Sequence, residues 1–296
     1  MEQFKMHQYQ LNNIQENFQF EIFSLQNYIE RRGEELMIPH TQDFYQIIWF
    51  KSASGLYTVD FNEYNVFENA LFFIAKNQVH SFKSLNKCDG FVINFGDSFL
   101  VQKDKDVDFF LKCNLFNNPY QNPSCCIGSG WEYKLDEYIS QMRLELAEKK
   151  SYGREELLRL YLKAFLIQVQ RRKHQLEKLD SGRNPFPDNE KRNLLIKFIN
   201  AVEDNFNKNL TVSQYSALLN VSTRTLSNLT LQHLQKRPKQ IIQERKILES
   251  KRLLIHSHIS VKEIAYRIGI KDPEYFFRFF KKHTKISPNN FRKSIR

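Results

Sequence analysis

The chain has 296 residues, and its 44 lysine and arginine residues exceed its 33 acidic residues, which gives a net charge of +11 at neutral pH. Hydrophobic residues make up 41% of the chain, which is enough to form cores and excludes a disordered protein. Since no apolar run reaches the roughly 18 residues of a membrane span and the first ten residues are polar, we expect a cytoplasmic protein without membrane contact.

Residues 18–116 favour strands. Turn-forming residues at 52–55 and 62–65 separate several short runs of aromatic and β-branched residues. These runs lie at 18–23, 44–51, 56–61, 70–75 and 90–95. Short strands at regular spacing are typical of an all-β sandwich or barrel, so we expect a small β-barrel in this part of the chain.

Residues 131–179 predict a pair of helices. An apolar residue recurs every three or four positions from Leu135 to Leu146, and again from Leu158 to Val169. The segment Ser151–Gly153 is expected to separate the two helices. Their apolar faces must be buried, either on the β domain or on a second subunit.

The positive charge is concentrated in the last third of the chain. Residues 180–189 contain two prolines and one glycine and are predicted to be a linker. Residues 1–189 carry a net charge of −3, whereas residues 190–296 hold 22 lysine and arginine residues against 8 acidic ones, a net charge of +14. Such an asymmetry indicates a polyanion-binding domain joined to a second domain.

The basic domain contains an internal repeat. Leu210–Val221 aligns with Ile259–Ile270 at an offset of 49 residues, and beyond the turn the offset becomes 50. Each copy predicts a helix, a tight turn and a second helix, with Asn220 or Gly269 in the turn because both residues adopt a left-handed backbone at low cost. Helix-turn-helix motifs have this shape, and their second helix enters the major groove of DNA.

Capping residues indicate the same boundaries. Thr211 and Ser260 are suited to cap the first helix of each copy, and Ser222 and Asp272 the second. A further helix, which starts at Pro238 and is about 27 Å long, connects the copies. This length holds two recognition helices near one turn of DNA apart, roughly 34 Å, so one chain can read two successive major-groove segments.

The second copy continues into a long and specific stretch. Residues 260–292 are SVKEIAYRIGIKDPEYFFRFFKKHTKISPNNFR. They resemble the signature of the AraC/XylS family of bacterial transcription regulators, and residues 39–47 and 73–80 are similar to the cupin-type sensor domains of that family. The resemblance implies a mixed fold: a cupin-like effector-sensing β-barrel (1–130), a helical dimerisation element (131–179), a linker (180–189) and an all-α DNA-binding domain with two helix-turn-helix motifs (190–296).

The resemblance also implies roles for single residues. The residues expected to face DNA are Ser222, Arg224, Thr225, Ser227, Asn228, Lys271, Glu274, Arg278, Lys281 and Lys282. Among them the lysines are expected to contact phosphates, which supply affinity rather than sequence reading. For Glu274 and Arg278, an ion pair on a solvated helix face is the alternative to base contact. The residues expected in the core are Leu226, Leu229, Tyr275, Phe276, Phe279 and Phe280.

The β domain offers few reactive groups. Metal-binding cupins present a His-x-His pair, whereas here Gln42 stands two residues after His40, so no metal, cofactor or catalytic site is expected. We expect a small-molecule effector pocket lined by His40, Tyr45, Trp49 and His80. The alternative is that these four are ordinary core or hydrogen-bonded strand residues.

These features predict a homodimeric, sequence-specific regulator rather than an enzyme. We expect it to bind double-stranded operator DNA, to recruit RNA polymerase as an activator and to respond to a small-molecule effector. A repressor or a ligand-independent regulator is the alternative within this class. Two alternatives lie outside this class. The first is a cupin enzyme fused to a DNA-binding tail, which the presence of bound iron, zinc or manganese would support. The second is a nucleoid protein, which would bind DNA with little sequence preference.

Overall fold

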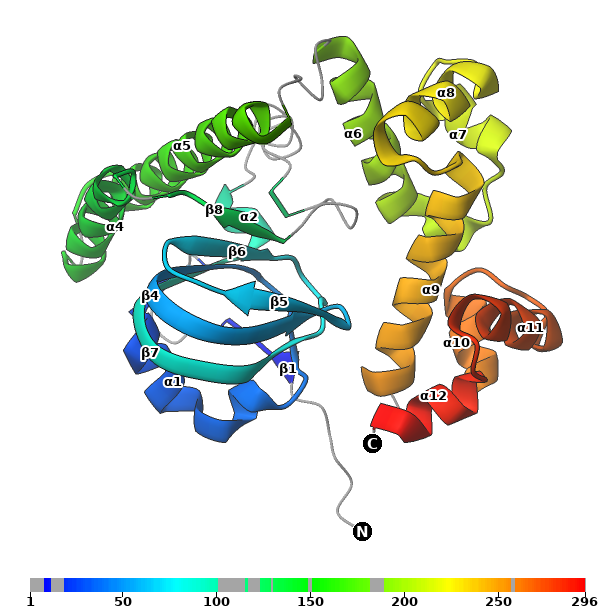
Figure 1. Ribbon diagram of the computed structural model, residues 1–296, viewed down its shortest axis with the longest axis horizontal. Helices are drawn as coiled ribbons and strands as arrows, with labels where there is room; N and C mark the ends of the chain where they lie inside the picture. The colour runs from blue at the N-terminus through cyan, green and yellow to red at the C-terminus, as the bar shows by residue number, and fades with distance from the viewer. Residues whose placement is uncertain are drawn as a thin grey trace. The chain divides into compact units, whose positions relative to one another are not determined.

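The computed structural model describes residues 8–11, 19–100, 115–116, 123–128, 130–148, 151–181, 189–256 and 259–295. Two compact units divide the chain, one spanning His7–Pro185 and the other containing Phe186–Arg296. The first unit is rich in strands, and the second is helical (Figure 1). Among the described residues, no helix combines the length and the apolar character that crossing a membrane requires.

The described strands of the first unit form a curved six-stranded sheet (Figure 1). Its order is β2–β7–β4–β6–β8, and β5 pairs with the far end of β4. Within the described residues β2 does not pair with β8, so these strands do not close the predicted barrel. The strands are β2 (Phe20–Ser24), β4 (Tyr45–Val59), β5 (Asn62–Val66), β6 (Ala70–Ile74), β7 (His80–Phe95) and β8 (Ser124–Cys126).

Shorter elements complete this unit. Strands β1 (Gln8–Tyr9) and β3 (Thr41–Gln42) pair in parallel. Helix α1 (Leu25–Arg32) and the 3₁₀ turn η1 (Gly33–Met37) follow β2, and α2 (Asp97–Leu100) follows β7.

Both predicted turns of the β domain are wrong. Residues 52–55 lie inside β4, where the pairing with β7 shifts register after Phe50 and after Ser52. Small residues occupy this irregular stretch, and a Cβ on Gly55 would lie 2.1 Å from the backbone oxygen of Ser84. The small residues at 52–55 therefore mark an irregular point of the sheet where two strands approach closely. Such a point favours the same small residues as a turn, which is why the sequence suggested one.

The second predicted turn, at 62–65, belongs to strand β5. The chain reverses two residues earlier, at Asp60 and Phe61, whose φ angles are 47° and 71°. Two consecutive residues with left-handed φ are what a two-residue hairpin of type I′ requires.

Two helices cover one face of the sheet. Side chains along β4 alternate, so that Ile47 and Trp49 pack in a cluster with α4 (Glu132–Ala147) and α5 (Arg154–Ser181). Ile48 and Phe50 face the other side and pack with α1. The predicted helical pair and the break between its helices are confirmed, and the pair buries its apolar stripe on the β domain.

The second unit consists of short helices around a long one, α9. Its buried residues include Phe198, Tyr215, Leu226, Phe276 and Phe280. The elements are α6 (Asn189–Asn205), η2 (Phe206–Lys208), α7 (Val212–Leu218), α8 (Thr223–Leu234), α9 (Pro238–His256), α10 (Val261–Arg267), α11 (Pro273–Thr284) and α12 (Pro288–Ile295).

Candidate nucleic-acid interface

The two sequence repeats form two helix-turn-helix motifs with the same local chemistry. In α7 and α10, the side chains of Thr211 and Ser260 accept a hydrogen bond from the backbone three residues later, and Gln214 and Glu263 bond back to the cap. These reciprocal bonds are capping boxes, which satisfy free N–H groups at a helix start. The recognition helices α8 and α11 are capped by Ser222 and Asp272, as expected.

The turns inside the motifs also match. Asn220 and Gly269 have φ angles of 54° and 80°. The backbone N–H of Val221 donates to the oxygen of Ser216 over 3.0 Å, and that of Ile270 donates to the oxygen of Ala265 over 2.8 Å. This six-residue bond next to a left-handed residue defines the Schellman end of a helix. The shape predicted from the repeat is therefore confirmed in both copies.

One face of each recognition helix is buried. Leu226 and Leu229 lie in the core, as do Phe276, Phe279 and Phe280. Tyr275 was expected beside them, but its side chain is 49% exposed. It lies one position before Phe276 on a helix, and neighbouring positions differ by about 100° around the axis, so both rings cannot face the core.

The opposite face of each helix is exposed. In α8, Arg224, Thr225 and Asn228 are exposed and Ser227 is half-buried. The hydroxyl of Ser222 accepts a hydrogen bond from the backbone N–H of Thr225 over 3.0 Å and lies 2.8 Å from the Thr225 hydroxyl. Of the residues predicted to face DNA in α8, Arg224 and Asn228 thus present side chains that form no hydrogen bond or ion pair with the described residues.

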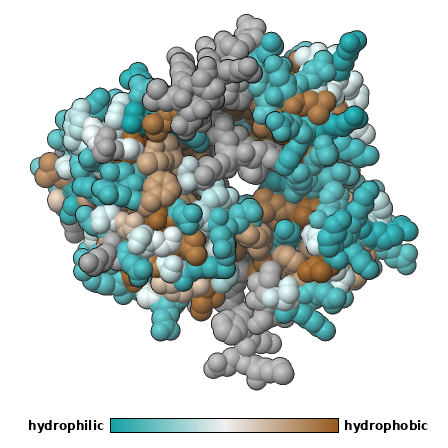
Figure 2. Space-filling view, viewed as in Figure 1, coloured by the Kyte–Doolittle hydropathy of each residue, from teal (hydrophilic) through white to brown (hydrophobic). Residues whose placement is uncertain are grey.

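The exposed face of α11 carries positive charge. Lys271, Glu274, Arg278, Lys281 and Lys282 are all exposed, and none of them has an ion-pair partner within the described residues. The alternative of an internal Glu274–Arg278 pair is therefore not what the structure contains. Figure 2 shows largely hydrophilic side chains over the visible surface of this unit.

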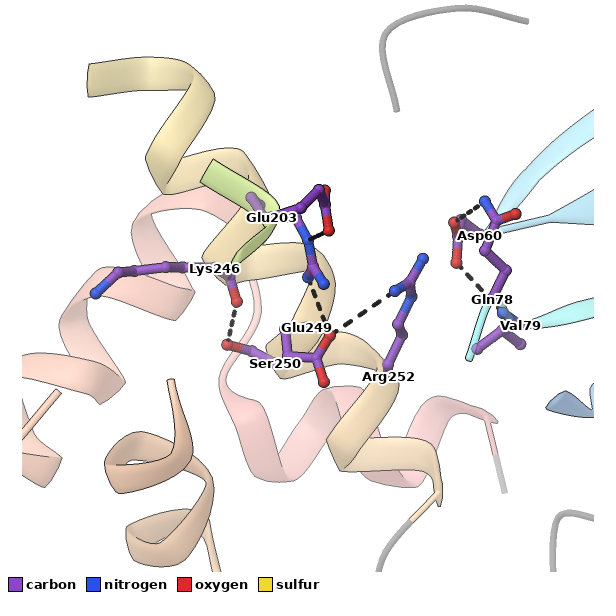
Figure 3. A network of polar contacts seen from close by, with 9 residues as sticks. Asp60, Gln78, Val79, Glu203, Lys246, Glu249, Ser250 and Arg252 are labelled. Carbon is purple, nitrogen blue, oxygen red and sulfur yellow. Dashed lines mark hydrogen bonds and ion pairs between the residues drawn. The ribbon is translucent and has the colours of Figure 1, made fainter. Parts of the chain in front are cut away.

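Ion pairs on α9 hold this helix against α6. The guanidinium of Arg245 contacts carboxylates of Glu203 and Glu249 at 2.7 and 3.0 Å, and Arg252 lies 3.8 Å from Glu249 (Figure 3). At the end of the family-like stretch, Arg292 donates to the backbone oxygens of Leu254 and Ile259. Because Arg245 and Arg252 are almost fully buried, these contacts fix α6 and α9 rather than serving DNA.

The structure brings together two of the four predicted effector residues. His40 and His80 pair through their backbones, and their rings lie 4.2 Å apart between centroids. Trp49 lies in the cluster under α4 and α5, and Tyr45 packs against the same cluster, stacked on Phe95. They therefore lie on the sheet face opposite to His80, whose partners belong to the other cluster.

A buried polar cluster surrounds His80. Its Nδ1 lies 2.7 Å from the hydroxyl of Tyr57, and its Nε2 lies 3.1 Å from Oε1 of Gln42. Burial, together with the positive charges of His40 and Arg32, holds the pKa of His80 well below its ordinary value. Sequence reasoning did not include Gln42 and Tyr57 in the site, because Tyr57 meets His80 only through the pairing of β4 with β7. No group of three or more potential metal ligands is present among the described residues.

Acidification is expected to destabilise the first unit. Below about pH 6.5 the unfolded chain takes up a proton on residue 80 that the folded chain does not, so the free energy of unfolding falls by up to about 1.4 kcal/mol per pH unit. Urea unfolding at pH 7.5 and 5.5, followed by tryptophan emission, measures this loss, since Trp49 and Trp131 both lie in this unit. The control is His80→Gln, whose unfolding should depend less on pH; an unchanged dependence would contradict the assignment.

Comparison with known proteins agrees with this geometry. A profile described as a helix-turn-helix domain matches residues 215–294, which contain most of both motifs. The chain is 22% identical over 271 residues to the HTH-type transcriptional activator RhaR of Enterobacter sp. (strain 638), covering 89% of each chain. The same activator of Escherichia coli (strain K12) is 20% identical over 271 residues, again with 89% of each chain covered.

Solved structures align with the chain as well. ToxT from Vibrio cholerae O395 aligns with 94% of this chain and 98% of its own, at 15% identity and a TM-score of 0.44. The helix-turn-helix match and the relatives that align along nearly the whole chain support the resemblance to the AraC/XylS family of DNA-binding transcriptional regulators.

Proposed function

We propose that this regulator reads two successive major-groove segments, one with α8 and one with α11. The observation that carries the proposal is the pair of matched motifs, each with one buried face and one exposed polar face. On α11 that exposed face bears positive side chains without ion-pair partners in the described chain. Cations that are free of internal partners are available to phosphates and base edges.

Roles follow from position and chemistry. Arg278 suits guanine, which offers two acceptors in the major groove, and Asn228 suits adenine. Glu274 lies on the exposed face of α11 together with Arg278, and Arg224 lies on the exposed face of α8 together with Asn228. Lys271, Lys281 and Lys282 would contact phosphates, as point charges do. The main role of Ser222 and Thr225 is to cap the start of α8. Ser227, which is half-buried, lies at the edge of the exposed face of that helix.

Arg278→Ala is expected to weaken binding to the operator by about 1–3 kcal/mol, roughly 5- to 150-fold, and to relax discrimination at one base pair. Fluorescence anisotropy with operator and scrambled duplexes measures both effects. The matched control is Lys282→Ala, which should weaken both duplexes alike and reduce the salt slope by about one. Equal losses of Arg278→Ala on the two duplexes would remove its base-reading role.

The division of labour is also part of the proposal. We assign residues 1–130 to effector sensing, 131–179 to dimerisation, 180–189 to a linker and 190–296 to DNA binding. Exposed apolar side chains on and between α4 and α5 support the dimerisation role, since such groups favour burial in an interface. They are Tyr133, Leu144, Tyr152, Leu160 and Ile167.

An effector would bind near the His40–His80 pair. Nε2 of Gln42 and Oε1 of Gln46 are buried and have no hydrogen-bond partner within the described residues. Buried polar atoms without partners are costly, and a polar ligand would satisfy them. The relatives named as transcriptional activators favour activation over repression. We propose that the activation involves recruitment of RNA polymerase.

Selection of bound duplexes from a random pool, with and without metabolite mixtures, tests this function. The expected result is an asymmetric site with two conserved blocks about one helical turn apart, and altered recovery with one mixture. A nucleoid protein would enrich no sequence. Stoichiometric iron, zinc or manganese in the purified protein would favour the enzyme alternative.

A further inference from the structure

A cavity of about 320 Å³ that is partly open to solvent lies in the C-terminal unit. Its walls come from the segment Asn209–Val212 that leads into α7, from one face of α9, and from the second motif through Ile270, Tyr275 and Phe279. Small-molecule sites typically occupy about 300–1,000 Å³. The cavity is therefore large enough for a small ligand, and both helix-turn-helix motifs contribute to it.

Part of the wall is apolar. Ile242, Ile270 and Phe279 each line the cavity and keep 6–8% of their surface exposed. The ring of Tyr275 stacks on that of Phe279, with 6.2 Å between centroids. A ligand with a hydrocarbon or aromatic portion would bury this surface from water.

The polar feature of the wall is a buried lysine. Lys246 is 7% exposed, and its ammonium lies 2.6 Å from Oδ1 of Asn209, a neutral amide oxygen. No acidic residue is among those that line the cavity, and burial lowers the pKa of Lys246 to about 8. A buried ammonium without an opposite charge is costly, which makes this position favourable for an anion.

The helix geometry separates Lys246 from the carboxylates of α9. Lys239, Ile242, Gln243 and Lys246 follow the spacing of one helix face and line the cavity. Figure 3 shows Lys246 extending from α9 on the side away from Arg252, whose guanidinium approaches Glu249. The acidic residues of the ion-pair cluster therefore do not neutralise Lys246.

We propose that this cavity binds a small organic anion, whose carboxylate or phosphate group contacts the ammonium of Lys246 and whose apolar body packs against Ile242 and Phe279. Pairing with an anion would give the largely buried ammonium an opposite charge in addition to its neutral amide partner. The site is separate from the effector pocket proposed in the first unit.

Binding there would act on DNA recognition. The ligand would contact α9 and α11 together with the segment before α7, so it would favour one arrangement of the two motifs over others. A ligand shifts an equilibrium between arrangements by its difference in affinity for them. The cavity thus offers a second input to the regulator, inside the unit that holds the DNA-reading helices.

Calorimetric titration of the full-length protein with benzoate and with benzyl alcohol, its neutral analogue, tests the site without DNA. We expect one benzoate per chain and an affinity at least about tenfold above that for benzyl alcohol. At pH 9.5 the affinity for benzoate should fall by about tenfold or more relative to pH 7, because Lys246 loses its proton while benzoate stays charged.

Variants locate the site. Lys246→Met keeps the aliphatic stem and removes the charge, and it should abolish the preference for benzoate. The matched control is Lys262→Met, an exposed lysine of α10 outside the cavity, which should bind benzoate like the wild type. If Lys246→Met does not fold, the pH series of the wild type decides. Equal affinities for the two probes, pH-independent binding, or equal losses in both variants would each overturn the proposal.

A backbone phosphate of bound DNA is another source of anionic oxygen. Salt titrations of duplex binding by the wild type and Lys246→Met, without organic anion, distinguish the two sources. For a free small anion, the slopes of log affinity against log salt should be equal. A slope smaller by about one in the variant would assign the ammonium to a DNA phosphate and overturn the small-anion assignment.

Discussion

Phe276→Ala is expected to lower the free energy of unfolding of the C-terminal unit by about 3–5 kcal/mol. The ring of Phe276 is fully buried on α11 and lies 5.8 Å from that of Phe280, so its removal leaves a cavity that short helices cannot fill. Loss of this packing would also release the recognition helix from α9. Binding to any duplex should therefore weaken together with stability.

Urea unfolding of the full chain measures this loss. Circular dichroism at 222 nm follows the helices, while tryptophan emission reports on the first unit alone, because neither Trp49 nor Trp131 belongs to the second. Tyr275→Ala, one position earlier and half exposed, serves as the control and should cost less than about 1 kcal/mol. Similar losses for the two variants would show that the buried face of α11 has been assigned wrongly.

Gly269→Ala is expected to destabilise the same unit by about 3 kcal/mol. A Cβ at this position would lie 2.0 Å from the backbone oxygen of Asn207, and the φ angle of 80° is strained for alanine. Backbone strain of this kind costs about 1–3 kcal/mol, and overpacking typically adds about 1–3 kcal/mol. Because the contact joins the turn of the second motif to η2, a shift there would also disturb the packing of α10 on α9.

The first motif supplies the control for this change. Asn220 occupies the equivalent turn with a φ angle of 54° and is exposed. Asn220→Ala therefore measures the cost of left-handed backbone for alanine alone, about 1–2 kcal/mol. The difference between the two variants, in urea unfolding, gives the cost of the contact with Asn207. If both variants lose the same stability, that contact is unimportant.

The helical unit could be predicted well because its signals are local. Caps such as Thr211 and Ser260, and turn residues such as Asn220 and Gly269, act within a few positions of themselves, so a repeat in sequence becomes a repeat in structure. Tyr275 was misplaced because four aromatic residues in six positions cannot all face one side of a helix. Sequence alone did not show which ring would be left outside.

The β domain was harder to predict because its contacts are distant in sequence. The pairing of β4 with β7 places Tyr57 against His80, and a register shift near Ser52 changes which residues face each side. These features depend on strand partners 20 to 40 positions away, beyond the reach of a pattern in a short window. The same β4–β7 register places His80 and Trp49 on opposite faces of the sheet.

The connection between the helices is one residue longer in the second motif, since four residues separate α7 from α8 and five separate α10 from α11. The two motifs therefore differ in turn length as well as in the side chains of their second helices, so they are not interchangeable on a duplex. If α8 and α11 read bases as proposed, a binding site turned end for end would place Glu274 and Arg278 at the bases that Arg224 and Asn228 contact in the other orientation. Each bound chain would thus have a defined direction along the DNA, and a site would carry orientation as well as sequence.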